Sequence, residues 1–204
     1  MSGGEAETLA FYDREAAAYA DSERKSDVSE TLERFTAELP DGAAVMDLGC
    51  GGGWSSIQMA EAGFAVTPVD GSAGLAAEAE ARTGLKVRVA RFDEIEDVAA
   101  FDGIWASYSL HHIPRDELPD ALRRIARALK PGGAFFIGVK GGEGEARDKL
   151  GRFYTYYRAD ALQGLLAAAG LQPLWTEESE GTGFDDEPCL LVEVIARKKE
   201  DAVA

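Results

Sequence analysis

Cysteine and histidine are scarce in this sequence, with two of each among 204 residues. Cys50 and Cys189 lie far apart, and neither has a metal-ligating neighbour at the usual spacing. This scarcity argues against a disulfide scaffold and against a structural zinc site. We therefore predict no bound metal and expect the fold to rest on its hydrophobic core.

Basic residues are also few, since 21 Lys and Arg face 37 Asp and Glu and give a net charge of -16. A surface of this charge repels phosphate backbones and anionic lipid headgroups, so neither nucleic acid nor a membrane is an expected partner. The sequence shows no secretory signal and no apolar run long enough to cross a bilayer. These absences together predict a cytoplasmic location.

The remaining composition is that of a globular domain, with 46% hydrophobic and 28% charged residues. A chain of 204 residues can bury one sizeable core. We predict a single domain over residues 1–204, made of a helical cap at 1–42, a core at 43–198 and a tail at 199–204.

Residues 45–54 organise the chain, because an apolar run there contains Asp47 and then opens into glycines. The pattern predicts a strand, a tight loop and a helix over residues 54–62. Glycine allows positive φ angles and leaves no Cβ between the backbone and a ligand. Loop amides and the helix start would face an anionic or carboxylate-bearing ligand, and Asp47 would accept bonds from ligand N–H or O–H groups. A nucleotide-like cofactor is therefore expected at this strand end.

The glycine spacing distinguishes between cofactors. A dinucleotide site requires Gly-x-Gly-x-x-Gly, but the third glycine place is occupied by Trp54. The stretch from Asp47 to Gly53 instead resembles the first motif of the class I S-adenosylmethionine-dependent methyltransferases. Asp70, at the end of the next predicted strand, can bind both ribose hydroxyls, as acids in dehydrogenases also do.

Strand-like and helical segments alternate from residue 45, which predicts a parallel sheet with helices on both faces. The final two strand-like runs, at 171–176 and 190–196, follow each other without a helix and predict an antiparallel hairpin. We therefore expect a doubly wound α/β fold with a seven-stranded, mostly parallel sheet and an N-terminal helical cap. The expected strands are 45–48, 65–69, 86–92, 103–107 and 134–139, and the expected helices are 8–22, 28–39, 54–62, 73–82, 95–100 and 115–129.

The resemblance implies which residues contact the cofactor S-adenosyl-L-methionine. Asp93 would bind the adenine amino group, although it can equally be an acid at a helix N-terminus. Tyr19 would cover the methionine end, or else belong to the core face of its helix. The full implied set is Tyr19, Asp47, Gly49, Cys50, Gly51, Asp70, Gly71, Ser72, Phe92, Asp93 and Ser107.

Methyl transfer requires mainly that the nucleophile is aligned with the reactive methyl and that water is excluded. His112 follows the fourth strand and matches a histidine that recurs in the resembled family. It would take a proton or position the acceptor. The alternative is a histidine that shapes the wall and caps a backbone group.

Residues 139–157 combine glycines, cations and tyrosines at the end of the fifth strand. We expect this segment to close over the pocket and to select the acceptor, which would carry an anionic group. The alternative is a loop whose cations pair with nearby acids such as Asp148. The expected acceptor-binding residues are Tyr12, Lys140, Arg147, Arg152 and Tyr156.

The sequence thus predicts an S-adenosylmethionine-dependent methyltransferase that acts on a small molecule. Two alternatives remain. One is a module that binds S-adenosylmethionine or S-adenosylhomocysteine without transfer. The other is a nicotinamide-dependent oxidoreductase, which Trp54 and the terminal hairpin disfavour. The acceptor and the oligomeric state are not specified.

Overall fold

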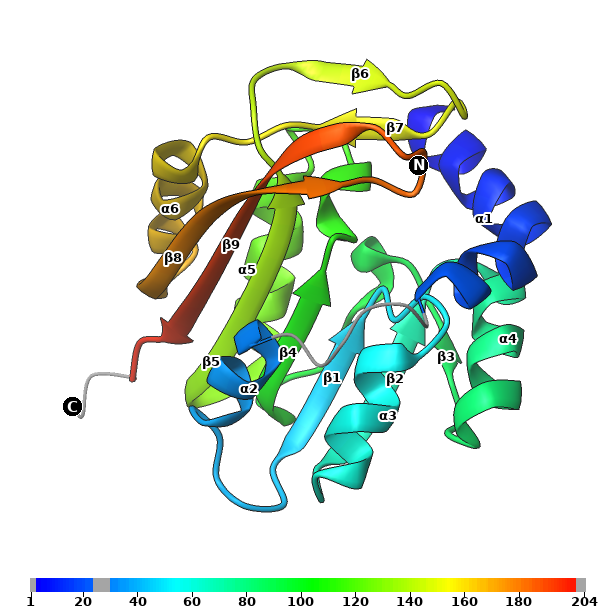
Figure 1. Ribbon diagram of the computed structural model, residues 1–204. Coiled ribbons are helices and arrows are strands. Elements are labelled where there is room, and N and C mark those ends of the chain that lie inside the picture. The colour runs from blue at the N-terminus through cyan, green and yellow to red at the C-terminus, as the bar shows by residue number, and fades with distance from the viewer. Residues whose placement is uncertain (1–2, 24–29, 201–204) are drawn as a thin grey trace.

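A seven-stranded sheet forms the centre of the computed structural model, which describes residues 3–23 and 30–200 (Figure 1). The strand order is β3-β2-β1-β4-β5-β9-β8, and this confirms the predicted fold class. The strands are β1 (Ala44–Leu48), β2 (Ala65–Asp70), β3 (Arg88–Val89), β4 (Phe101–Ser107), β5 (Leu129–Lys140), β8 (Leu171–Thr182) and β9 (Pro188–Lys198).

The order of the strands reverses at β1, which pairs in parallel with β2 on one side and with β4 on the other. Crevices at such a reversal are the usual ligand sites of open α/β sheets. β9 runs antiparallel to both β5 and β8, so the predicted terminal hairpin is confirmed. The alternating pattern of the chain therefore places the glycine loop after β1 at the switch point.

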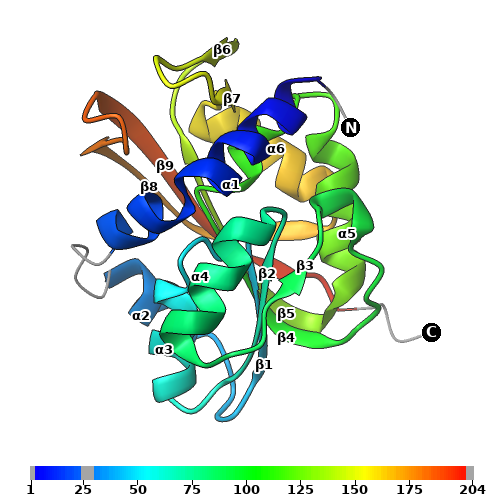
Figure 2. The same cartoon turned by 90° about the vertical axis from the view of Figure 1, so that its right-hand side faces the viewer.

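Helices cover both faces of the sheet (Figure 2). α3 and α4 lie on one side and α5 on the other, as right-handed crossovers in opposite directions from β1 and β4 require. Ser72 caps α4 by accepting a bond from the Leu75 amide at 3.1 Å. The helices are α1 (Gly3–Glu23), α2 (Glu30–Thr36), α3 (Trp54–Glu61), α4 (Ala73–Thr83), α5 (Leu118–Ala128) and α6 (Ala159–Ala168).

Two apolar layers hold the sheet between these helices. The layer that contains α5 and α6 includes Leu122, Ile137 and Leu162, all completely buried. The layer under α2 and α3 includes Phe35, Met59 and Trp105, of which the indole stacks on Phe136 at a centroid distance of 3.8 Å. None of the helices in the described ranges has both the length and the apolar character needed to span a bilayer.

Helix α1 and a small ribbon lie across the carboxyl edge of the sheet (Figure 1). The ribbon pairs β6 (Glu145–Arg147) antiparallel to β7 (Phe153–Thr155). Asp13 of α1 accepts bonds from the Ser72 hydroxyl at 2.6 Å and the Gly74 amide at 3.0 Å. The Phe153 amide donates to the Thr8 hydroxyl at 2.9 Å. The helical cap is therefore tied both to α4 and to the ribbon.

Several predicted elements differ in the structure. The helix expected at residues 95–100 is absent, because the Ala99 and Ala100 amides donate to carbonyls of Arg127 and Ala128 and hold this stretch in an irregular conformation. The strand expected at 86–92 shortens to β3, and the loop at 130–133 is incorporated into β5. The segment after β5, expected as a loop, contains β6 and β7. Helix α2 matches the second predicted helix in part, and Val28 lies outside the described residues.

Candidate functional site

The loop after β1 has the predicted backbone conformation, with φ angles of 78°, 56° and 83° at Gly49, Gly51 and Gly53. Several of its amides, which were expected to face a ligand together with the start of the next helix, are instead bonded within the protein. The Gly49 and Cys50 amides both donate to the Val69 carbonyl, and the Gly51 amide donates to Asp70 at 2.9 Å. The loop is therefore held by the protein itself.

Packing explains why this loop needs glycine. A Cβ at Gly49 would lie 2.3 Å from the Cβ of Ser109, and one at Gly53 would lie 2.8 Å from a methyl of Thr83. The Ser109 hydroxyl donates to the Leu48 carbonyl at 2.7 Å, which fixes the obstructing side chain. The glycines therefore allow the loop to approach neighbouring elements closely.

Asp70, at the end of β2, is bonded to the glycine loop. Its carboxylate accepts the Gly51 amide and, at 2.8 Å, the Ser72 amide. Burial raises its pKa to about 6, while these amides act in the opposite direction. A carboxylate accepts up to four hydrogen bonds, so Asp70 retains capacity for a further donor, and it lines a cavity.

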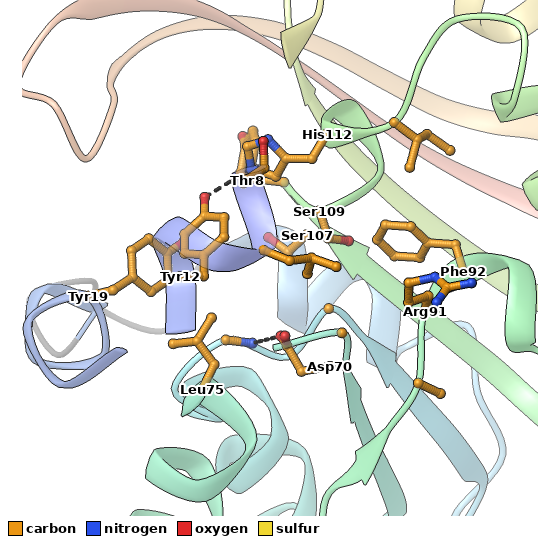
Figure 3. A pocket seen from close by; sticks show the side chains of 17 residues that line it. Thr8, Tyr12, Tyr19, Asp70, Leu75, Arg91, Phe92, Ser107, Ser109 and His112 are labelled. Atoms are coloured by element: carbon orange, nitrogen blue, oxygen red, sulfur yellow. Dashed lines mark hydrogen bonds between the residues drawn. The ribbon is translucent and has the colours of Figure 1, made fainter. Parts of the chain in front are cut away.

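This first cavity is small, with a volume of about 80 Å³. Figure 3 shows Asp70 and Leu75 on one side of the cavity, Tyr12 and His112 on the opposite side, and Phe92 with Arg91 beyond them. Of the predicted residues, the cavity brings together Tyr12, Tyr19, Gly49, Gly51, Asp70, Gly71, Phe92, Ser107 and His112.

Two residues predicted to bind the cofactor, Asp93 and Ser72, line neither this cavity nor the wider cavity beside it. Asp93 is exposed and accepts two bonds from Arg91 at 3.0 and 2.8 Å, and this pairing lowers its pKa. Ser72 is fully buried, and its hydroxyl bonds Asp13 and caps α4. Both side chains therefore have partners within the protein.

His112 is joined to Tyr12 of α1. Its Nδ1 lies 2.7 Å from the Phe153 carbonyl, which can only accept, so Nδ1 carries the proton. Nε2 is then the acceptor for the Tyr12 hydroxyl at 2.9 Å. Burial lowers the pKa of His112 to about 4 and raises that of Tyr12 to about 12, so both are neutral at pH 7.

Arg152 lies behind this pair. It is 1% exposed, it forms an ion pair with Asp148 at 2.7 Å, and its Nη1 donates to the Tyr12 hydroxyl at 3.2 Å. Arg147 is paired with Glu7 of α1 at 2.7 Å. The alternative in which both arginines pair with acids is therefore the arrangement seen, although Glu7 was not anticipated.

Lys140 and Tyr156, the remaining residues predicted to bind the acceptor, both pack against the ring of Tyr154. The Lys140 ammonium lies 4.2 Å above the centre of the Tyr154 ring, and Tyr156 stacks on the same ring at 6.2 Å. Lys140, Arg147, Arg152 and Tyr156 line neither of the two cavities at this edge. Tyr12 is the predicted acceptor residue that does.

A second, wider cavity of about 900 Å³ adjoins the first and shares Tyr19, Gly49, Ser107 and Tyr108 with it. Cys50 and Asp47 line this second cavity. Asp47 is 2% exposed and accepts the Ser56 hydroxyl at 2.5 Å, and burial raises its pKa to about 7. Its carboxylate thus ties the end of β1 to α3.

Tyr108 and Glu193 both line the second cavity, and neither was predicted from the sequence as a site residue. The Tyr108 hydroxyl donates to Glu193 at 2.9 Å, and burial together with this carboxylate raises the pKa of Tyr108. Tyr108 has a φ angle of 51°, which is rare for a non-glycine residue. An acid inside the apolar run of β9 was the signal available in the sequence. Within the described ranges, no group of three or more His, Cys, Asp or Glu is arranged to hold a metal ion.

Comparison with known proteins gives a consistent result. The profile of the methyltransferase domain family matches residues 20–175. The ubiquinone biosynthesis O-methyltransferase of Xanthomonas axonopodis pv. citri is 39% identical over 116 residues, which cover 52% of this chain and 47% of that protein. The chain thus spans about half the length of this curated relative.

Solved structures resemble the whole chain. The 1,6-didemethyltoxoflavin-N1-methyltransferase of Burkholderia thailandensis, solved with S-adenosylhomocysteine, has a TM-score of 0.74 and 26% identity, and covers 98% of this chain and 92% of its own. An S-adenosylmethionine-dependent methyltransferase from Mesorhizobium loti shares the fold, with a TM-score of 0.63, 24% identity and coverage of 81% and 96%. The chain therefore belongs to the methyltransferase domain family, within the class I group that uses S-adenosylmethionine.

Proposed function

We propose that this protein transfers a methyl group from S-adenosylmethionine to a small-molecule acceptor. The observation that carries the proposal is the buried Asp70 carboxylate in a cavity that joins a second cavity at the switch point of the sheet. One cavity would hold the nucleoside, and the other leaves room for an acceptor beside it.

The residues present fit this cofactor. Asp70 offers lone pairs to the ribose hydroxyls, and Phe92 and Leu75 give apolar surface for the base. Trp54 and Ser55, at the start of α3, line the second cavity, where a helix N-terminus favours a carboxylate. When bound, the cofactor supplies a methyl group on a positively charged sulfur.

The Tyr12–His112 pair serves to position groups at the boundary of the site. His112 Nε2 already accepts the Tyr12 proton, and a pKa of about 4 makes it a weak base. An acceptor hydroxyl can be deprotonated there only if it takes the place of Tyr12. The hydrogen bond instead fixes α1 over the first cavity, where it excludes water.

Relatives support a small-molecule acceptor. The Xanthomonas protein is named for ubiquinone biosynthesis, and the Burkholderia structure holds 1,6-didemethyltoxoflavin. The net charge of -16 disfavours binding to nucleic acid. Because the relatives methylate oxygen in one case and nitrogen in the other, they do not select the acceptor atom.

Thermal denaturation tests the cofactor. We expect S-adenosylhomocysteine to raise the melting temperature with the logarithm of its concentration above Kd, and NADH to leave it unchanged. Stabilisation by NADH alone would favour the oxidoreductase. Release of S-adenosylhomocysteine in the presence of an acceptor panel then separates an enzyme from a module that only binds.

A further inference from the structure

The second cavity is lined by acids, whereas a site for an anionic acceptor should be lined by cations. Its described lining contains the acids Asp47, Asp186 and Glu193 and no lysine or arginine. Its walls are rich in aromatic rings, namely Tyr19, Trp54, Trp105, Tyr108 and Phe184. In the proposed binding mode the cofactor's carboxylate takes the start of α3, so an anionic acceptor would meet these acids without a compensating cation.

The nearby buried cations are engaged elsewhere. Arg152 forms its ion pair with Asp148, and Lys140 lies over the ring of Tyr154. Neither lines this cavity. The cations that the sequence suggested for an anionic acceptor are therefore used to hold the ribbon and its aromatic neighbours.

Polar atoms of the cavity wall lack partners. The Trp105 indole is 2% exposed, and its Nε1 makes no hydrogen bond within the described residues. Gln58 Oε1 is likewise unpaired in that part of the chain. Both atoms are covered by the surrounding protein, so they make the wall more polar but do not contact a ligand directly in this conformation.

Glu193 is the acid of this cavity whose side chain is fixed by hydrogen bonds. Its two oxygens accept hydrogen bonds from the Tyr108 hydroxyl at 2.9 Å and the Thr31 hydroxyl at 3.0 Å. A carboxylate accepts up to four hydrogen bonds, so capacity remains on each oxygen. The positive φ of Tyr108 is a strained conformation that these contacts maintain beside the cavity.

We propose that this cavity is the acceptor subsite and that it takes a nitrogen compound with an aromatic ring, whose N–H is bound by Glu193. This proposal rests on the proposed methyltransferase function. The nitrogen lone pair forms the N–CH₃ bond as the S–CH₃ bond breaks, and the positive charge passes from sulfur to nitrogen. The N–H proton is then lost to the Glu193 carboxylate and from there to water.

Binding of matched small probes tests the proposal without turnover. Benzylamine, benzyl alcohol and benzoate would be titrated by saturation-transfer NMR into the protein loaded with S-adenosylhomocysteine. We expect benzylamine to bind at least about tenfold more tightly than benzoate. Glu193→Gln should weaken benzylamine about tenfold and leave benzyl alcohol unchanged.

Glu180→Gln is the matched control, since it removes the same charge from an exposed position of β8 that does not line the cavity. In Glu193→Gln the new amide still accepts from Tyr108 and donates to Thr31, so the fold should survive. If it does not fold, the ranking of probes on the wild type still decides. Benzoate binding as tightly as benzylamine, or equal losses in both variants, would overturn the proposal. Failure of S-adenosylhomocysteine to bind the wild type would instead refute the proposed function.

Discussion

The two halves of the carboxyl edge hold their buried charges in different ways. In the half built by β1, β2 and β4, Asp70 is surrounded by backbone amides from Gly51 and Ser72 and faces a cavity. In the half built by β5, β7 and α1, Arg152 is bound by Asp148 and by Tyr12, 140 positions away. The first half leaves its charge available for a ligand, and the second uses its charge to bind the cap.

This contrast explains which predictions the sequence could support. The strand, glycine loop and Asp70 depend on contacts between residues close in sequence, and spacing alone locates them. The partner of Arg147 is Glu7, and the partner of His112 is Tyr12, which no spacing rule connects. Asp93 was assigned to adenine by its position, but the structure pairs it with Arg91. Glu193 was overlooked because its role depends on a hairpin that returns to β5.

Arg152→Ala should have the largest effect, because it leaves the buried side chain of Asp148 without its cationic partner. We expect a loss of about 3–5 kcal/mol in the free energy of unfolding, measured by chemical denaturation. Arg147→Ala is the control, since the pair with Glu7 is partly exposed and is worth less than about 1 kcal/mol. Similar losses in both variants would contradict the expectation that the buried ion pair contributes more to stability than the exposed one.

The pH dependence of stability tests the buried acids of the first half. The pKa of Asp47 is raised from 3.8 to about 7, so the folded state favours the protonated form. Its stabilising contribution is present below about pH 4 and is lost as the pH rises to about 7. Compared with Asp47→Asn, the wild type should lose roughly 2–4 kcal/mol across this range. The buried histidines have lowered pKa values and change the stability in the opposite direction, but they occur in both proteins and cancel in the comparison. Parallel pH profiles of the two proteins would contradict the raised pKa of Asp47.

Tyr12→Phe should have a smaller effect, because the ring packing is kept and one hydroxyl is lost. We expect a loss of about 1–3 kcal/mol, since His112 Nε2 and Arg152 Nη1 each lose a partner. The ¹⁵N shift of His112 Nε2 should move toward that of an unbonded imidazole. Tyr156→Phe is the control, as its hydroxyl makes no hydrogen bond within the described residues. An unchanged Nε2 shift in Tyr12→Phe would refute the pairing.

Calorimetric titration of S-adenosylhomocysteine into Asp70→Asn and Asp93→Asn tests most directly which acid holds the cofactor. Both variants remove one carboxylate that the sequence assigned to binding, but Asp70 lines the first cavity and Asp93 does not. We predict an affinity at least about tenfold weaker for Asp70→Asn, because a charge-assisted bond to the ribose is lost. Asp93→Asn should bind like the wild type. Unchanged affinity in Asp70→Asn, or a comparable loss in Asp93→Asn, would contradict the account.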